Sequence, residues 1–180
     1  FNTPPLIEAS DTGPWFHTNS FGPQIEDAIT FYTTAAFAAS PSGNGVAVPL
    51  TPTDIANIGR FLRVLNAAMN AQLAIARINA LIAVSNDQKN HNRPLQQTLG
   101  ELALTEVNDA IGVLAAVTSL NVSAQTQLQT AVTALQCAAT HASHTQRLRC
   151  AEDALPLIVS ANESLGSGMA FTMGAGSLMF

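Results

Sequence analysis

The chain has 180 residues, a net charge of −5, 47 % hydrophobic residues and only 11 % charged residues. The length suits one domain, or one domain with an appendage, and the apolar balance excludes a disordered chain. With one lysine and six arginines, the sequence has no basic stripe, which argues against nucleic-acid binding. No apolar run reaches the roughly 20 residues that a membrane span needs, so we expect no transmembrane segment.

The scarcity of charge leaves two interpretations of the surface. In the first, much of the surface meets something else, such as missing sequence, another subunit or a cofactor. In the second, the chain is a secreted protein with a neutral coat of Thr, Ser, Asn and Gln. Because the chain begins at Phe1 rather than Met, we expect it to be processed or clipped, with any signal peptide already removed.

Residues 1–23 are rich in proline and glycine, which rules out a long helix or a central strand there. We expect an extended, irregular segment that lies on another part of the protein. Pro23 suits the first turn of a helix, and apolar residues at helical spacing predict a helix over 24–37. Residues 38–51 are predicted to form a loop.

Four longer helices are predicted after this loop. Thr51, Pro52 and Asp54 are typical of a helix start, with a capping hydroxyl, a first-turn proline and a first-turn acid. Apolar spacing then predicts helices at about 52–85, 95–119, 123–141 and 144–165, with Ser123 as a cap and Pro156 as a kink. The fold class is therefore all-α, with an irregular front segment followed by an up-down helical bundle.

The two cysteines lie on either side of the predicted turn near 141–144. Cys137 and Cys150 are each roughly six or seven residues from its centre, which places both about 10 Å along antiparallel helices. They can therefore face each other at disulfide distance, and a disulfide indicates an oxidising compartment. The alternative is a pair of small buried thiols in a cytosolic protein. His141 and His144 lie between them, but their spacing is weak support for a zinc site.

Four elements follow one another in residues 1–66. They are Pro4-Pro5-Leu6, then Pro14-Trp15-Phe16-His17, then Ile25 to Tyr32, then Leu50 to Asn66. In this order they resemble the closing segment of the C-terminal haem domain in the di-haem cytochrome c peroxidase family. The resemblance implies that 1–66 close a cytochrome-c-like haem domain and that 67–180 are a helical extension.

The resemblance also implies a ligand to the haem iron. Classical members of the family offer a methionine from the short helix, and here Tyr32 stands in that position if one residue is inserted after His17. A branch of the family that oxidises protein tryptophans is similar in placing a tyrosine there. A phenolate ligand stabilises ferric iron and favours high-valent chemistry. The alternative is a core tyrosine bonded to a backbone carbonyl.

The same resemblance implies a porphyrin wall from the first two elements. Pro5, Leu6, Trp15 and Phe16 would shield the haem from water, and His17 would bond a propionate or tune the distal pocket. The alternatives are plain core packing for Trp15 and a structural role for His17.

Three departures from the family pattern bear on these expectations. Ile7 replaces an arginine, Thr18-Asn19-Ser20 replaces a glycine-containing stretch, and the chain has no Cys-x-x-Cys-His. The haem c would therefore be carried by a missing N-terminal segment or a companion chain. The helices after about residue 85 have no recognised counterpart in the family.

The resemblance predicts the C-terminal fragment of a secreted or periplasmic bacterial di-haem peroxidase-like protein. The parent reaction would be peroxide-dependent oxidation or electron transfer, and the chain alone is expected to be inactive. The helical bundle would serve as a docking surface for a protein partner. The alternative, from another class, is a haem-free helical interaction module descended from the same family. The acids and serines show no arrangement that indicates an independent hydrolase or metalloenzyme.

Overall fold

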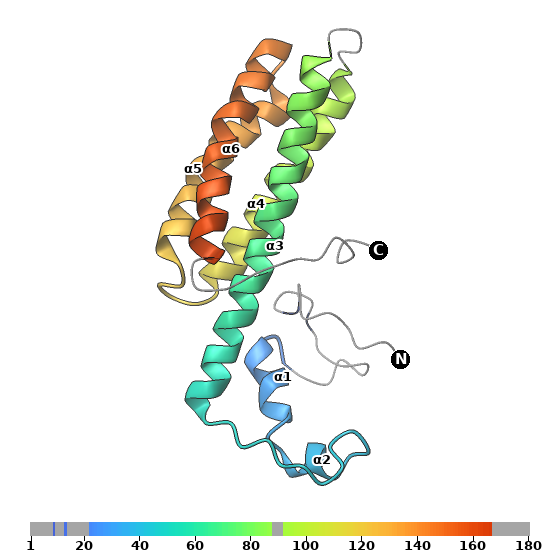
Figure 1. The fold of residues 1–180 in the computed structure, drawn as a ribbon, viewed down its shortest axis with the longest axis vertical. Helices are drawn as coiled ribbons and strands as arrows, with labels where there is room; N and C mark the ends of the chain where they lie inside the picture. The colour runs from blue at the N-terminus through green and yellow to red at the C-terminus, as the bar shows by residue number, and fades with distance from the viewer. Residues whose placement is uncertain (1–8, 10–12, 14–21, 88–91, 167–180) are drawn as a thin grey trace.

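The computed structural model describes Ala9, Gly13 and residues 22–87 and 92–166. Within these residues every regular element is a helix, which confirms the all-α class (Figure 1). The helices in chain order are α1 (Ile25–Phe31), α2 (Ala35–Ala38), α3 (Pro52–Asn86), α4 (Arg93–Ala115), α5 (Val122–Thr140) and α6 (His144–Gly166).

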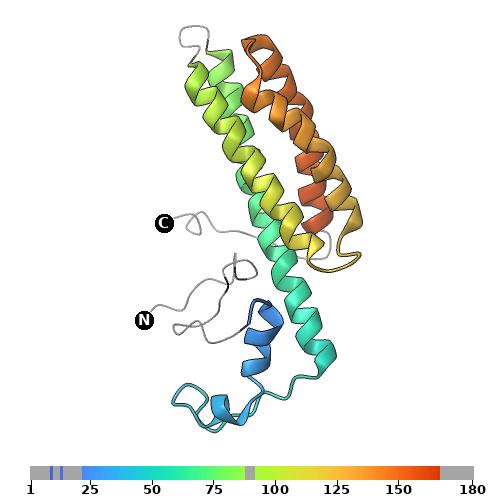
Figure 2. The same ribbon diagram turned by 180° about the vertical axis from the view of Figure 1, so that it is seen from behind.

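Helices α3 to α6 form an up-down bundle. Each helix packs against its neighbours in the ring, α3 against α4 and α6, and α5 against α4 and α6, as Figures 1 and 2 show from opposite sides. The short connections between consecutive helices force antiparallel neighbours, which is the usual topology of such bundles. The predicted up-down bundle is therefore confirmed.

The core of the bundle follows a seven-residue repeat in all four helices. Buried positions alternate at spacings of four and three, which is typical of coiled-coil packing with 3.5 residues per turn. Alanine is the commonest residue at these positions, so the helix backbones can approach closely. The buried series are Ala67, Ala71, Ala74, Ile78, Leu81 and Ser85 on α3; Gln96, Gly100, Ala103, Val107, Ala110 and Leu114 on α4; Ala124, Leu128, Ala131, Leu135 and Ala138 on α5; and Arg147, Ala151, Ala154, Ile158, Ala161 and Leu165 on α6.

Helices α4 and α5 approach closely at Gly100 on α4. A Cβ atom added there would lie 2.9 Å from both the Cα and the N of Ala139 on α5. These are backbone atoms, so only movement of a whole helix would make room for a side chain. Glycine at this position therefore sets the α4–α5 distance.

The first part of α3 extends beyond the bundle and carries a second, smaller core. Because α4 has 23 residues and α3 has 35, roughly the first third of α3 has no partner in α4. There α1 packs on α3 through Ile25, Ala28, Ile29, Leu62 and Leu65 (Figure 2). The core of the bundle begins at Val64 and Ala67. The predicted division at 66/67 thus falls inside one continuous helix.

The predicted helix starts agree with the structure in one case and disagree in another. Thr51 caps α3 by accepting from the backbone N–H of Asp54 at 3.2 Å, and the Asp54 carboxylate accepts from the backbone N–H of Thr51 at 2.9 Å. By contrast, Ser123 is not a cap, because α5 begins one residue earlier. Its N-cap is Asn121, whose φ of 47° is in the left-handed region, a conformation that Asn adopts more readily than most residues.

The predicted helix over 24–37 is wrong as a single element. The chain turns at Tyr32 to Thr34, and α2 starts anew with the Thr34 hydroxyl accepting from the N–H of Phe37 at 3.2 Å. The hydroxyls of Thr33 and Thr34 also donate to the carbonyls of Thr30 and Phe31. Threonines compete with the helix for backbone groups in this way, which ends α1 early.

The structure gives three further details of the later helices. The helix expected at 95–119 ends at Ala115, where turns replace its last predicted residues. Leu102, expected on the inner face, is exposed, and Ala103 takes the buried position beside it. Pro156 lies inside α6, which continues on both sides of it.

Candidate functional site

Tyr32, the predicted iron ligand, lies directly after α1 with 43 % of its surface exposed. Its ring meets those of Phe31 and Phe37 at centroid distances of 5.9 and 4.9 Å, in edge-to-face geometry. Phe31 and Phe37 meet each other in the same way at 5.9 Å. Such contacts contribute about 0.5–1.5 kcal/mol each beyond area burial. We call these three residues the aromatic triad.

The loop after α2 holds Phe37 in place. The N–H of Gly45, which has a φ of 76°, donates to the Ala38 carbonyl at 2.8 Å. A Cβ atom at Gly43 would lie 2.0 Å from the carbonyl oxygen of Phe37. The loop therefore folds back onto α2 only because Gly43 lacks a side chain.

An ion pair ties α1 to α3. The guanidinium of Arg63, only 3 % exposed, donates to both carboxylate oxygens of Glu26, at 2.5 and 2.9 Å. The bond from Arg63 is the main reason that the pKa of Glu26 lies below its ordinary value. Gly59 leaves room for this contact, since a Cβ there would lie 2.3 Å from Glu26 Oε1.

An open cavity of about 330 Å³ includes Arg63 in its lining and lies between α3, α4 and the two residues before α1, Pro23 and Gln24. Its polar lining includes Gln24, Arg63, Asn108 and Asp109, and the small residues Gly112 and Ala116 leave space along α4. Because Glu26 already neutralises Arg63, Asp109 gives the lining a net negative charge.

The other residues predicted to wall a haem lie outside the described part of the chain. These residues are Pro5, Leu6, Trp15, Phe16 and His17. Their roles remain predictions from the family resemblance, as does the ligand role of Tyr32.

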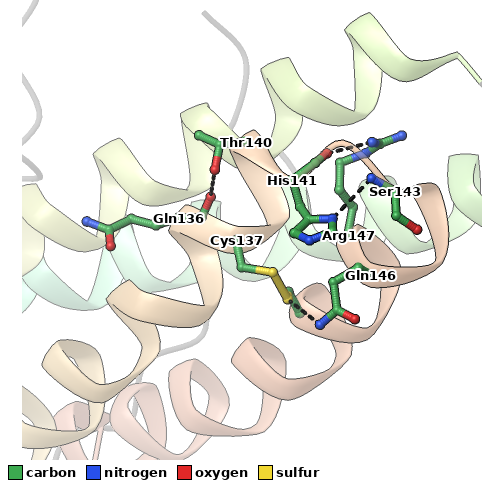
Figure 3. The surroundings of a disulfide bond; sticks show 8 residues. Gln136, Cys137, Thr140, His141, Ser143, Gln146 and Arg147 are labelled. Carbon is green, nitrogen blue, oxygen red and sulfur yellow. Dashed lines mark hydrogen bonds between the residues drawn. A yellow bond between two sulfur atoms is a disulfide. The ribbon is translucent and has the colours of Figure 1, made fainter.

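Cys137 and Cys150 form the predicted disulfide (Figure 3). The bond joins α5 to α6 with a Cα–Cα distance of 5.9 Å, within the range that unstrained disulfides span. The residues between them do not gather into a metal site. His141 Nδ1 accepts from the Ser143 N–H at 3.0 Å, and among the described residues no three His, Cys, Asp or Glu side chains come together as metal ligands.

Sequence reasoning missed the buried arginine beside this disulfide. Arg147 is 2 % exposed and donates twice to Gln96 Oε1, at 3.1 and 2.7 Å. It also donates to the carbonyls of His141 and Ala142 at 2.8 and 2.9 Å, which caps the end of α5 (Figure 3 shows the turn). Burial, and then the charge of Arg93, lower the pKa of Arg147. The seven-residue repeat was the signal available in the sequence, because Arg147 is four residues before Ala151 on the inner face.

The fold and these contacts define an all-α protein in which a disulfide-linked four-helix bundle carries α1, α2 and the loop after them on the first part of α3. Comparisons of the chain with models of known families, with curated proteins and with solved structures gave no match.

By length and composition, α3 is apolar enough to cross a bilayer, and 44 % of its most apolar window is buried inside the protein. Core helices of soluble proteins pass the same test, so the expected absence of a membrane span stays a prediction.

Proposed function

We propose that this chain is the C-terminal part of a di-haem cytochrome c peroxidase-like protein in a bacterial periplasm. In this proposal, the front residues supply one wall of a c-type haem and Tyr32 supplies an axial ligand. A preceding segment or a companion chain carries the Cys-x-x-Cys-His that this chain lacks. The parent reaction is peroxide-dependent oxidation or electron transfer.

The observation that carries the proposal is the setting of Tyr32. A ligand from this chain to a haem held elsewhere must be accessible from outside and fixed in direction. Tyr32 is 43 % exposed, and its ring contacts the rings of Phe31 and Phe37, which also contact each other. A tyrosine buried in the core, which was the alternative interpretation, would not be accessible to a haem held elsewhere.

The residues around Tyr32 fit a porphyrin in their chemistry. The aromatic triad offers an apolar, partly exposed surface against which a flat macrocycle can pack. The phenol oxygen would lose its proton on binding iron, and the resulting anion would stabilise the ferric state. When bound, the haem would supply the redox chemistry, whereas the chain would supply the ligand, the wall and the exclusion of water.

The proposal is tested on the native protein together with whatever segment precedes Phe1. A pyridine haemochrome assay is expected to detect haem c, and the sequence upstream or of a companion chain is expected to contain Cys-x-x-Cys-His. Tyr32→Phe removes only the hydroxyl. It is expected to leave the haem content unchanged while altering the ferric absorption spectrum and raising the reduction potential.

A matched control is Phe37→Leu, which perturbs the aromatic triad and leaves the phenol in place. This variant is expected to retain the ferric spectrum of the parent. Native protein without haem, or an upstream sequence without the attachment motif, would overturn the proposal. A spectrum unchanged by Tyr32→Phe would remove the ligand role alone.

The second candidate is a haem-free helical interaction module. The observation that favours it is the bundle itself, whose core is closed by side chains of α3 to α6 and whose last hairpin is crosslinked. Such a unit can present a rigid surface without any cofactor. Native protein that has its upstream sequence intact and no Soret band would support this candidate.

A further inference from the structure

The open cavity between α3, α4 and the two residues before α1 plays no part in the proposed haem site. Its α4 wall is a stripe of residues at spacings of three and four, which places them on one face of the helix. The stripe consists of Asn108, Asp109, Gly112, Val113 and Ala116 and spans about 12 Å along the helix axis. With a volume of about 330 Å³, the cavity is at the lower end of the range typical of small-molecule sites. It therefore suits a small, elongated ligand.

Gly112 leaves the middle of this stripe open, although glycine is, after proline, the least favourable residue inside a helix. At Gly100 the packing of the chain requires glycine, because an added Cβ would lie 2.9 Å from the backbone of Ala139. At Gly112 an added Cβ would meet no atom within 4 Å, so the packing of the chain does not require glycine there. The space at Gly112 is part of the cavity, which is the result expected if a ligand occupies it.

The charges around the cavity favour a cation. Arg63 lines the cavity, but its guanidinium donates to both carboxylate oxygens of Glu26, which neutralises its charge. The ion pairs within the described residues involve Arg63 and Arg77, and Asp109 belongs to neither pair. The last carbonyls of α4, which ends at Ala115, add partial negative charge at the other end of the stripe.

Asp109 and Arg63 lie at opposite ends of the cavity. Helices α3 and α4 are antiparallel neighbours, and Arg77 contacts Glu106 across them. Arg63 lies about four turns before Arg77 on α3, and the same distance beyond Glu106 passes the end of α4. Arg63 is therefore on the side of Ala116, which is about 10 Å along α4 from Asp109. A cation beside Asp109 is thus separated from the guanidinium.

We propose that this cavity binds a small primary amine in its protonated form. The ammonium group donates to the Asp109 carboxylate and the Asn108 side-chain carbonyl, and a short alkyl chain lies along Gly112 and Val113. Because Asp109 is exposed, the ion pair contributes little on its own, and burial of methylene groups supplies the rest of the binding energy. We therefore expect a dissociation constant in the millimolar range. The inference does not depend on haem.

Anions and metal ions fit the cavity less well than an ammonium group. An anion would meet an already neutralised Arg63 at one end and would be repelled by Asp109 at the other. Metal ions in proteins are typically held by several His, Cys, Asp or Glu ligands, and the described residues contain no group of three that could hold one. A neutral molecule of the same length lacks the attraction to Asp109, so the test includes one.

The test is a titration of the full, isotope-labelled chain with pentylamine at neutral pH, followed through the backbone amide shifts in two-dimensional NMR spectra. Pentylamine is expected to shift the α4 amides from Asn108 to Ala116 in a saturable way. Pentanol has the same alkyl chain and no charge. It is expected to bind about two- to fivefold more weakly, as the loss of one exposed ion pair predicts.

Asp109→Asn removes the carboxylate charge and is expected to weaken pentylamine binding by about two- to fivefold. Glu101→Gln is the matched control, because Glu101 is an exposed carboxylate on α4 outside the cavity lining. It is expected to change the affinity by less than about 1.5-fold, since distant exposed charges are screened. Gly112→Leu fills the middle of the cavity. It is expected to weaken binding by at least about tenfold, because the alkyl chain loses its apolar contacts, without lowering the unfolding temperature.

Pentylamine that shifts no amide between Asn108 and Ala116, or that binds no more tightly than pentanol, would overturn the proposal. So would equal losses of affinity in Asp109→Asn and Glu101→Gln. A folded Gly112→Leu variant that binds as tightly as the parent would do the same. Far-UV circular dichroism checks folding, and the comparison of Asp109→Asn with Glu101→Gln decides the proposal even where Gly112→Leu does not fold.

Discussion

The front unit, which we define as residues 22–63, and the bundle of residues 64–166 are stabilised in different ways. The bundle buries a continuous core from four helices and adds a disulfide and a buried arginine cap. The front unit packs two short helices and a loop on one stretch of α3, with a small core and one ion pair. An isolated helix as short as α1 is unstable in water, so the front unit depends on α3. The bundle closes its own core.

The same contrast extends to the surfaces. Exposed aromatic residues gather in the front unit, at Tyr32 and at Phe61, whereas the bundle buries mostly alanine and leucine. A region with a small core and exposed aromatic rings gains the most stability when another molecule buries those rings. The comparison therefore makes the front unit the better candidate for contact with another body and the bundle the more rigid part of the chain.

The strongest test of this comparison truncates one core side chain in each region and compares the losses in the free energy of unfolding. Leu128→Ala in α5 removes a fully buried side chain and is expected to lower the free energy of unfolding by about 2–5 kcal/mol. Ile58→Ala in the front unit removes a partly buried one and should cost about 1 kcal/mol, because less area leaves water. Urea unfolding followed by far-UV circular dichroism measures both. Equal losses would show that the front unit is as well packed as the bundle.

Removing the disulfide tests how much of the bundle's stability comes from this covalent link. Cys137 and Cys150 are 13 residues apart, and closing so short a loop stabilises by about 3 kcal/mol in the chain-entropy description. The variant with serine at both positions is expected to lose that amount in urea unfolding. Reductant should destabilise the parent chain and leave the double variant unchanged, which serves as the control. A parent chain insensitive to reductant would contradict a stabilising role.

As the pH is lowered, we expect the front unit to unfold at a higher pH than the bundle. Arg63 holds the pKa of Glu26 below its ordinary value of 4.5, so the stabilisation is fully present above that value. It is lost as the pH falls through the lower, folded-state pKa. Glu26→Gln leaves Arg63 without a charged partner and is expected to cost about 1–3 kcal/mol, between the exposed and buried limits for ion pairs. Hydrogen exchange of α1 amides, compared with those of α5, measures the effect.

The control for this pH effect is Asp54, whose pKa is lowered by its bonds to Thr51. Because Asp54 is untouched by Glu26→Gln, the variant should still lose some stability in acid, with a shallower dependence than the parent. A variant with an unchanged pH profile would show that the ion pair is not what responds to acid.

Effects of opposite sign are expected from two glycines of α4. Gly100→Ala would press a methyl group on the backbone of Ala139 and is expected to cost about 1–3 kcal/mol despite a better helix propensity. Gly112→Ala meets no atom within 4 Å and is expected to stabilise the chain by up to about 1 kcal/mol. Thermal unfolding of the two variants gives opposite signs. The same sign for both would mean that the α4–α5 distance adjusts freely.

The helices of the bundle were predictable because their signals are local and repeated. The start of α3 rests on Thr51, Pro52 and Asp54, whose bonds span three residues. The disulfide was predictable because a hairpin of known geometry links position in the sequence to position in space. The search for large apolar residues missed the alanine repeat, which is why Leu102 was expected inside instead of Ala103.

The break at Tyr32 was harder to predict, because apolar spacing continued through it. Three threonine hydroxyls, at positions 30, 33 and 34, bind nearby carbonyls, and the choice between a continued helix and a turn depends on small energy differences. The candidate haem residues were proposed from resemblance alone. Of these candidate residues, Tyr32 is the one that lies in the described part of the chain.

The sequence by itself determined the helical class, the main helices of the bundle and the pairing of the cysteines, because these follow from interactions between residues close in the chain. The tertiary structure decided which polar groups are buried. Arg147 meets Gln96 across 51 positions, and Arg63 meets Glu26 across 37. An arginine is stable inside only where distant segments bring acceptors to it. The same is true of the space around Gly100, which exists because another helix crosses there.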